Sequence, residues 1–301
     1  MNKKNVGIRR NANPEWKYSL LFVGPAVLYI CIFALYPVIY NFYLAFRNMT
    51  ARHFLNHTFV GLETFQELFS KGVLSTTIGN TIWYTVWCTI LQFIIGFAFA
   101  LLLSKNFPLA QGIRGTLLVG WLLPMTVTAI LFKFMFQTDI GIINYLLGAV
   151  GISPIEWLTN GTNAMWALII ANTWVGIPFD MVLLSTGLSG IGPEMYESAQ
   201  IDGANRIQSF FHITIPLLKS TIYSICILGV IYTFKVFDVV VVMTMGGPVD
   251  STEVMSTYSY KLAFKEFNFS EGSAVACILF VILFLAGLIY LRFIKEDEVM
   301  N

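Results

Sequence analysis

The sequence predicts an all-α integral membrane protein with six transmembrane helices. Of its 301 residues, 56% are hydrophobic and only 12% are charged, and the mean hydropathy is +0.71. These values are typical of proteins whose main solvent is membrane lipid. Several uncharged apolar runs reach the roughly 20 residues that a helix needs to cross the hydrocarbon core. The net charge of +1 provides no dense basic face, which argues against a nucleic-acid partner.

The six spans follow from these apolar runs in chain order. The first covers 18–46 and contains Pro25 and Pro37, which we expect to bend it. It is too long for a signal-peptide core and lacks a small-residue cleavage site, so we expect it to be retained. The run 142–151 is too short to cross and is expected at the membrane interface. The remaining spans are 80–104, 113–137, 164–188, 217–245 and 270–294.

The basic residues predict the orientation of these spans. Lys and Arg number 11 in the two tails and in the loops after spans two and four, against 5 in the opposite loops. By the positive-inside rule, both termini are expected in the cytoplasm. The predicted organisation is a cytoplasmic tail at 1–15, a first helix and outer loop at 16–75, a membrane domain at 76–291 and a cytoplasmic tail at 292–301.

The sequence lacks the common catalytic motifs. It contains no GxxxxGK[ST] phosphate loop, no HExxH and no serine nucleophile elbow, and its four cysteines lie singly in apolar runs. We therefore predict that the chain is not an enzyme and holds no metal or cofactor. A membrane-embedded enzyme with dispersed acids remains an alternative. An ion-coupled secondary transporter is another, although the paired interrupted helices common in such proteins are not evident.

One segment concentrates the scarce charges. It reads PEMYESAQIDGANRIQSFFHITIPLL and covers 193–218. Pro193 suits the first turn of a helix, and the glutamates that follow favour its positive N-terminal end. Asp202 and Gly203 form a turn dipeptide that breaks the helix, and a second apolar stripe follows. The residues alone predict two short cytoplasmic helices, which serve either as a plain connection on the membrane surface or as a docking element.

This segment resembles the cytoplasmic loop of binding-protein-dependent ABC importer permeases, whose pattern is EAA, three residues, G, nine residues, I, one residue and LP. Here the pattern reads Glu197-Ser198-Ala199, Gly203, Ile213 and Ile215-Pro216. Ser198 and Ile215 replace an alanine and a leucine. The resemblance extends over 76–291. The stretch 237–274 is similar to the sugar-importer branch, in the maltose-type or glycerol-phosphate-type first permease subunit.

The resemblance implies the type-1 transmembrane fold of ABC importers and a coupling loop at 191–219 that docks on an ATPase dimer. The implied coupling residues are Glu197, Ser198, Ala199, Gly203, Ile213 and Pro216, of which Glu197, Ala199 and Gly203 contact the ATPase. ATP and Mg²⁺ would be used by that ATPase and not by this chain. The other implied partners are a second, different permease subunit and an external solute-binding protein. The implied substrate is an oligosaccharide or related polyol, carried across the cytoplasmic membrane of a prokaryote.

Polar and aromatic residues inside the spans are candidates for the substrate path. Ionisable side chains there cost about 2.5–3.5 kcal/mol each on insertion scales, so they tend to face a cavity or a partner. Lys133 qualifies, but it also has the length to snorkel outward. Lys235 and Asp238 are three residues apart and are predicted to share a helix face, either as an ion pair or as part of the path. Phe234 and Phe237 are further aromatic candidates, with lipid contact as the alternative. The predicted path residues are Asn172, Thr173, Trp174, Asp180, Tyr232, Lys235 and Asp238.

Overall fold

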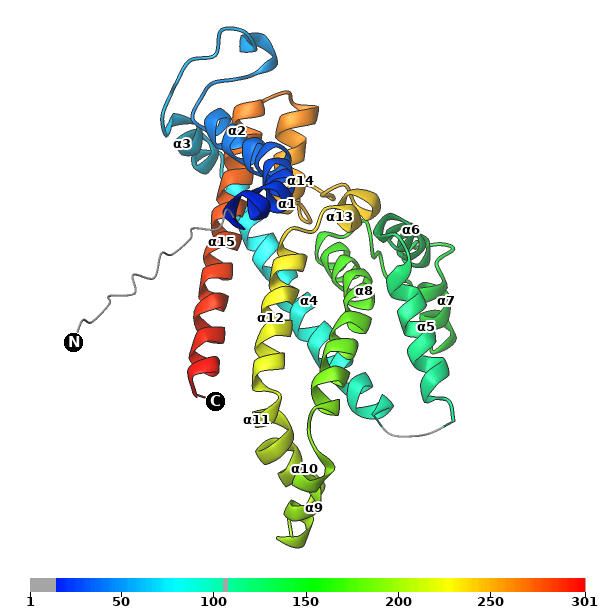
Figure 1. The fold of residues 1–301 in the computed structure, drawn as a ribbon. Coiled ribbons are helices and arrows are strands. Elements are labelled where there is room, and N and C mark those ends of the chain that lie inside the picture. The colour runs from blue at the N-terminus through cyan, green and yellow to red at the C-terminus, as the bar shows by residue number, and fades with distance from the viewer. Residues whose placement is uncertain (1–14, 105–107, 301) are drawn as a thin grey trace, which may run out of the picture.

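The computed structural model describes residues 15–104 and 108–300, and within them it is helical apart from loops and two isolated β-bridges. Four helices in this part of the chain are long and apolar enough to cross a membrane, and two bent helix pairs bring the possible spans to six. The predicted all-α membrane fold is therefore confirmed. The length of the molecule is occupied by α4 (Val73–Leu103), α8 (Gly161–Ser189), α12 (Lys219–Phe234) and α15 (Phe269–Met300) (Figure 1).

The long helices match five of the predicted spans in position. They are α1 (Glu15–Ile30), which continues through a π-helix (Cys31–Leu35) into α2 (Tyr36–Ala45), then α4 (Val73–Leu103), α8 (Gly161–Ser189), α12 (Lys219–Phe234) and α15 (Phe269–Met300). The shorter helices are α3 (Glu63–Ser70), α5 (Ala110–Leu122), α6 (Met125–Met135), α7 (Ile142–Ala149), α9 (Pro193–Ile201), α10 (Arg206–Ser209), α11 (Ile215–Leu217), α13 (Asp238–Met243) and α14 (Met255–Tyr260). Single helical turns occur at Ala51–His53, Phe210–Thr214 and Lys261–Lys265.

The centre of the bundle is the contact between α4 and α8, against which α12 packs. Two glycines bring these helices together. A Cβ on Gly96 of α4 would lie 2.7 Å from the Cβ of Asp180, and a Cβ on Gly176 of α8 would lie 2.2 Å from Cδ of Gln92. At Gly96, whose neighbours include the backbone of Ile177 and Met181, only a residue without a side chain fits, whereas at Gly176 the Gln92 side chain would have to move. Helices α4 and α8 are therefore in close contact at the level of their polar residues Gln92 and Asp180.

The third predicted span, 113–137, is not a single helix. It consists of α5 and α6, which meet at Leu123 and Pro124 with a bend of 103°. Pro124 has no N–H to donate, and its ring forces Leu123 into an extended conformation with ψ of 139°. The helix therefore ends at Leu122, and the predicted span 113–137 is a bent pair of helices.

The fifth predicted span, 217–245, is interrupted as well. Helix α12 ends at Phe234, and the residues up to Phe237 are not helical before α13 begins at Asp238. Carbonyls near this break are satisfied by other segments, since Ser256 donates to the carbonyl of Val236 and Lys133 Nζ donates to that of Val242 at 2.9 Å. The segment Arg206–Leu217 is bent 68° from α12.

This break corrects the predicted pairing of Lys235 with Asp238. Lys235 lies in the break after α12 and Asp238 begins α13, and the ion pairs within the described residues do not include them. The ammonium of Lys235 lies 5.3 Å from the ring centroid of Tyr232. Lys133 does not snorkel outward, because it is held by the carbonyl of Val242.

The ends of the chain differ from the central bundle. Within Leu21–Ala45 only Ala45 is buried, although α2 packs on α15. The predicted tail at 1–15 lies outside the described residues except for Glu15. At the other end, α15 continues to Met300, so the predicted tail at 292–301 is helical as far as that residue. The C-terminal end of α15 points toward the same end of the bundle as α9 and α10 (Figure 1).

The short run 142–151 forms α7, an eight-residue helix. Asn144 anchors it to the following loop, donating from Nδ2 to the carbonyls of Thr138 and Ile155 and accepting at Oδ1 from Trp157 Nε1 at 3.0 Å. The helix is far too short to cross a membrane, as the sequence predicted.

Candidate functional site

The helix–turn–helix predicted at 193–218 is present and projects beyond one end of the bundle (Figure 1). Helix α9 begins at Pro193 and ends at Ile201, and the φ of +85° at Gly203, two residues later, lies in the left-handed region. The N–H of Ala204 donates to the carbonyl of Ala199 at 2.9 Å, and the N–H of Gly203 donates to that of Gln200 at 3.1 Å. These two bonds are those of a Schellman motif, which favours glycine at this position.

The second arm starts with a capping box. Asn205 Oδ1 accepts from the N–H of Gln208 at 2.9 Å, and the Gln208 side chain accepts from the N–H of Asn205 at 2.8 Å. The helix then continues through the π-turn and α11 to the start of α12. The hydroxyls of Tyr196 and Thr214 lie 3.0 Å apart and join the two arms. The turn is therefore a defined element with its own internal bonds.

We call the segment 192–217 the projecting loop. Its predicted coupling residues lie along both arms. Glu197 and Ser198 are exposed on α9, Ala199 is half-buried, Gly203 forms the turn, and Ile213 and Pro216 lie in the second arm. A Cβ on Gly203 would meet no atom within 4 Å, so its backbone conformation, and not packing, requires glycine.

The projecting loop exposes apolar side chains beside the polar residues of its turn. Ile201 is 87% exposed, and Ile207 and Phe211 are also exposed. Hydrophobic side chains in the middle of a polar loop indicate a surface that another protein covers.

A largely apolar cavity with several polar groups lies within the bundle between α4, α5, α6, α8 and α12. It has a volume of about 380 Å³, which falls within the range of small-molecule sites. Its lining residues are Gln92, Trp121, Met125, Asn172, Val175, Gly176, Phe179, Asp180, Gly229, Tyr232 and Thr233. The structure thus brings together Asn172, Asp180 and Tyr232 among the predicted path residues.

Aromatic rings form one side of this cavity. The ring centroids of Trp121 and Phe179 are 6.2 Å apart, and those of Phe179 and Tyr232 are 5.9 Å apart at nearly a right angle. On the α4 side, Gln92 Nε2 donates to the carbonyl of Asn172 at 3.0 Å. The cavity therefore combines flat apolar surfaces with amide, hydroxyl and carboxylate groups.

The other predicted path residues lie elsewhere. Thr173 is buried but does not line the cavity, and the indole of Trp174 approaches Gly120 of α5. Lys235 and Asp238 are exposed at the ends of α12 and α13. Of the further aromatic candidates, Phe234 is buried in a hydrophobic cluster with Ala45, Leu68 and Met255, and Phe237 lies against Tyr260.

The sequence interpretation missed Gln92, Trp121, Phe179 and Thr233. The five lining positions of α8, of which only Asn172 and Asp180 were predicted, could have been found from spacing. The lining residues of α8 are 172, 175, 176, 179 and 180, which follow the i, i+3, i+4, i+7 and i+8 spacing of one helix face.

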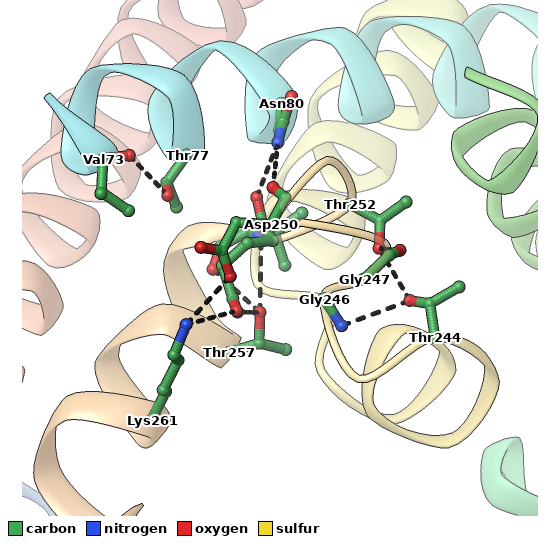
Figure 2. A network of polar contacts seen from close by, with 12 residues as sticks. Val73, Thr77, Asn80, Thr244, Gly246, Gly247, Asp250, Thr252, Thr257 and Lys261 are labelled. Atoms are coloured by element: carbon green, nitrogen blue, oxygen red, sulfur yellow. Dashed lines mark hydrogen bonds and ion pairs between the residues drawn. The ribbon is translucent and has the colours of Figure 1, made fainter. Parts of the chain in front are cut away.

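A second polar cluster lies at the opposite end of the bundle from the projecting loop, in the loop 244–254 between α13 and α14 (Figures 1 and 2). Asn80 of α4 donates to the carbonyls of Asp250 and Glu253 at 3.3 and 3.1 Å, and Lys261 Nζ lies 2.9 Å from Asp250 Oδ1. The hydroxyls of Thr244 and Thr252 lie 2.8 Å apart. The loop is thereby fixed to both α4 and α14.

Glu253 is the buried acid of this cluster. Burial raises the pKa of its carboxyl, which accepts from the hydroxyl of Thr257. The hydrogen bond to Asp250 raises the pKa of Lys261. A Cβ on Gly246 would lie 2.4 Å from Glu253 Oε2, so glycine is needed there. At the tip of the loop, Val249 is 98% exposed with a φ of +48°, a strained conformation that the surrounding bonds maintain.

Within the described residues, no cluster of three His, Cys, Asp or Glu side chains has the arrangement of a metal site. The two candidate sites are therefore the projecting loop, which offers a protein-binding surface, and the cavity, which offers a small-molecule site.

Comparisons with known proteins agree with this arrangement. The chain is 31% identical over 282 residues to the trehalose/maltose transport system permease protein MalF of Thermococcus litoralis, covering 92% of this chain and 94% of that protein. It is 29% identical to the sulfoquinovosyl glycerol transport system permease protein SmoG of Agrobacterium fabrum, covering 93% and 91% of the two chains.

Among solved structures, a chain of the bacterial alginate ABC transporter, crystallised with an alginate pentasaccharide-bound periplasmic protein, has the same fold. The TM-score is 0.79 at 21% identity, and the match covers 92% of this chain and 93% of that one. The family model for the binding-protein-dependent transport system inner membrane component matches residues 92–295, a range that includes the projecting loop and most of the cavity. This chain belongs to the family of inner membrane components of binding-protein-dependent transport systems.

Proposed function

We propose that this chain is the permease subunit of an ATP-driven importer and carries a sugar or related polyol across the cytoplasmic membrane. The observation that carries the proposal is the projecting loop, an exposed helix–turn–helix with apolar side chains beside its turn that holds the EAA-like pattern at 197–216. We expect no such docking element in an ion-coupled transporter or in a membrane-embedded enzyme.

The projecting loop would dock on a separate ATPase dimer. Glu197 and Ser198 are accessible on α9, and Ile201 and Ile207 provide the apolar contacts that protein interfaces bury at their centre. ATP and Mg²⁺ would be bound by the ATPase, since this chain has no phosphate loop. By the same reasoning, the chain is a transport subunit and not itself an enzyme.

The projecting loop also connects the two helices that contribute most to the cavity. Helix α8 leads into α9 through Gly190–Gly192, and α11 leads into α12. A movement of the docked loop would therefore act on Asn172 and Asp180 at one end and on Tyr232 at the other. Closure of the ATPases would favour one of two arrangements of the cavity because they bind the two states with different affinity.

The cavity supports a hydroxyl-rich solute. The apolar C–H faces of a sugar stack on rings such as Trp121, Phe179 and Tyr232, while Asn172 and Asp180 accept or donate hydrogen bonds to hydroxyls. Trehalose and maltose, the named solutes of one similar permease, support the same class. An external solute-binding protein would deliver the solute, and a second, different permease subunit would complete the path.

The proposal is tested by purifying the tagged chain in mild detergent and identifying the chains that co-purify. We expect an ATPase and a second permease subunit with the wild type, and ATP-dependent sugar uptake after reconstitution. In Gly203→Asp, we expect the ATPase to be lost because the left-handed turn that aligns the two arms is strained.

Gly151→Asp is the matched control. Gly151 has a φ of +81° and open space around its Cβ, as Gly203 does, but it follows α7 and lies outside the projecting loop. Loss of the ATPase from both variants would indicate general damage. A wild-type chain that purifies alone and moves solute without ATP would refute the proposal.

A further inference from the structure

Asp180 is a buried carboxylate without a protein partner in the described residues. Its exposure is 3%, it lines the cavity, and no hydrogen bond or ion pair from the described part of the chain reaches its oxygens. An ionisable side chain at this depth is costly unless something compensates for it. Protonation of the carboxyl, a solute in the cavity or a group on another subunit can supply that compensation.

The position of this carboxylate is fixed by packing. Gly96 of α4 lies against the Asp180 Cβ so closely that a methyl group there would be 2.7 Å away, and the backbone of Ile177 and Met181 fills the adjacent space. The side chain therefore has no room to withdraw between the helices. It presents its carboxyl group to the cavity.

The residues that line the cavity include no Lys, Arg or His. The two lysines of nearby segments are engaged outside it, since Lys133 donates to the carbonyl of Val242 and Lys235 lies over the Tyr232 ring on an exposed position. The remaining polar lining groups are amides and hydroxyls. A carboxylate or sulfonate on a solute would thus meet Asp180 with no lining cation to offset the repulsion.

We propose that Asp180 is a specificity-determining residue that selects uncharged, hydroxyl-rich solutes and rejects sugars that carry an acidic group. Solute hydroxyls donate to its carboxylate, in hydrogen bonds that the negative charge strengthens. The same charge acts against anionic solutes, so one residue both binds the correct class and excludes the wrong one. This inference rests on the proposed function and narrows its solute class.

The test measures binding to the complex purified in mild detergent, without the external binding protein, by equilibrium dialysis. The probes are matched pairs that differ in one acidic group: trehalose and its C6 carboxylate, sorbitol and gluconate, glycerol and glycerate. In the wild type we expect the neutral member of at least one pair to bind about tenfold or more tightly than its acid, which is the scale of one like-charge contact.

The variants Asp180→Asn and Asp180→Ser remove the charge, and in each we expect the neutral-to-acid ratio to fall to about threefold or less. Asp238→Asn removes an exposed acid outside the cavity and should leave the ratio unchanged. Equal binding of both members by the wild type, or an unchanged ratio in both Asp180 variants, would overturn the inference while the importer assignment stands.

Two further outcomes would overturn the inference about Asp180 for other reasons. If Asp180→Asn releases a second permease subunit from the complex and the binding ratio is unchanged, Asp180 is the partner of a cation on that subunit. If no neutral probe binds the wild type although an ATPase co-purifies, the sugar assignment itself fails, and the inference falls with it.

Discussion

At the scale of single residues, the geometry of the cavity depends on two glycines at the α4–α8 contact. Gly96 and Gly176 let the helices approach closely enough for Asp180 and Gln92 to share the cavity. A methyl group on Gly96 would also meet the carbonyl oxygen of Ile177 at 3.2 Å. Because these neighbours include main-chain atoms, a side-chain rotation cannot relieve the overlap.

We therefore expect Gly96→Ala to destabilise the protein by about 1–3 kcal/mol, as overpacking of a close-packed interior does. Thermal unfolding in detergent measures the loss. Gly79→Ala is the control, because Gly79 lies in the same helix with open space at its Cβ. If both variants unfold at the wild-type temperature, the close approach of α4 and α8 is not what stabilises the bundle.

Single residues also show which parts of the candidate site can be predicted from a sequence. Asn172, Asp180 and Tyr232 are polar groups within apolar runs, and their position in a cavity was predicted. Thr173 and Trp174 follow Asn172 directly, and successive helical residues point about 100° apart, so all three cannot face one cavity. Gln92 and Trp121 come from other helices, and only the packing of those helices brings them to Asp180.

At the scale of elements, hydropathy located the apolar runs but not their breaks. The runs 113–137 and 217–245 are continuous in composition, yet each contains a change of chain direction. One break has a local cause in Pro124. The break after Phe234 depends on tertiary hydrogen bonds, such as those that reach the carbonyls of Val236 and Val242, and no local signal predicts it.

The bend at Pro124 should straighten when the proline is removed. Val119 of α5 and Leu131 of α6 are both exposed, so spin labels attached to cysteines there report the bend by pulsed electron paramagnetic resonance. In Pro124→Ala we expect the distance to increase toward the roughly 18 Å that twelve residues span in a straight helix. Solute binding should weaken about tenfold, because Trp121 and Met125 move out of the cavity.

Pro154→Ala, in the loop after α7, is the control for this experiment and should change neither distance nor binding. The labels require a background in which the free cysteines, including the exposed Cys31, are replaced. An unchanged distance in Pro124→Ala would mean that contacts such as Lys133 to Val242 hold the bend without the proline.

At the scale of the whole molecule, the arrangement has two functional ends. The projecting loop lies at one end, and the loop 244–254 lies at the other, with the cavity between them (Figure 1). Helices α8 and α12 run between the two ends, which places the solute site on the path that connects the docking surface with the opposite face. The composition of the chain predicted that membrane lipid surrounds this fold. The position of the cavity follows only from how the helices pack.

The orientation of these ends in the membrane is a prediction from the basic residues. We expect the projecting loop in the cytoplasm and the loop 244–254 outside. In the cysteine-free background, single cysteines at Val249, which is 98% exposed, and at Leu55, which is 88% exposed, should react with a membrane-impermeant maleimide in intact cells. Cysteines at Glu197 and Gln200 in the projecting loop should react only after permeabilisation.

The labelling pattern distinguishes an error in the predicted orientation from an error in the predicted number of spans. If all four positions reverse, the excess of Lys and Arg does not set the orientation of this chain, and the ATPase would have to meet the loop 244–254. If the two ends label from the same side, an even number of segments crosses between Leu55 and Glu197 and between Glu197 and Val249, against the odd counts that the predicted spans give. The expected pattern places the exposed apolar side chain of Ile201 on the side where ATP is available, which is the condition for the projecting loop to work as a docking element.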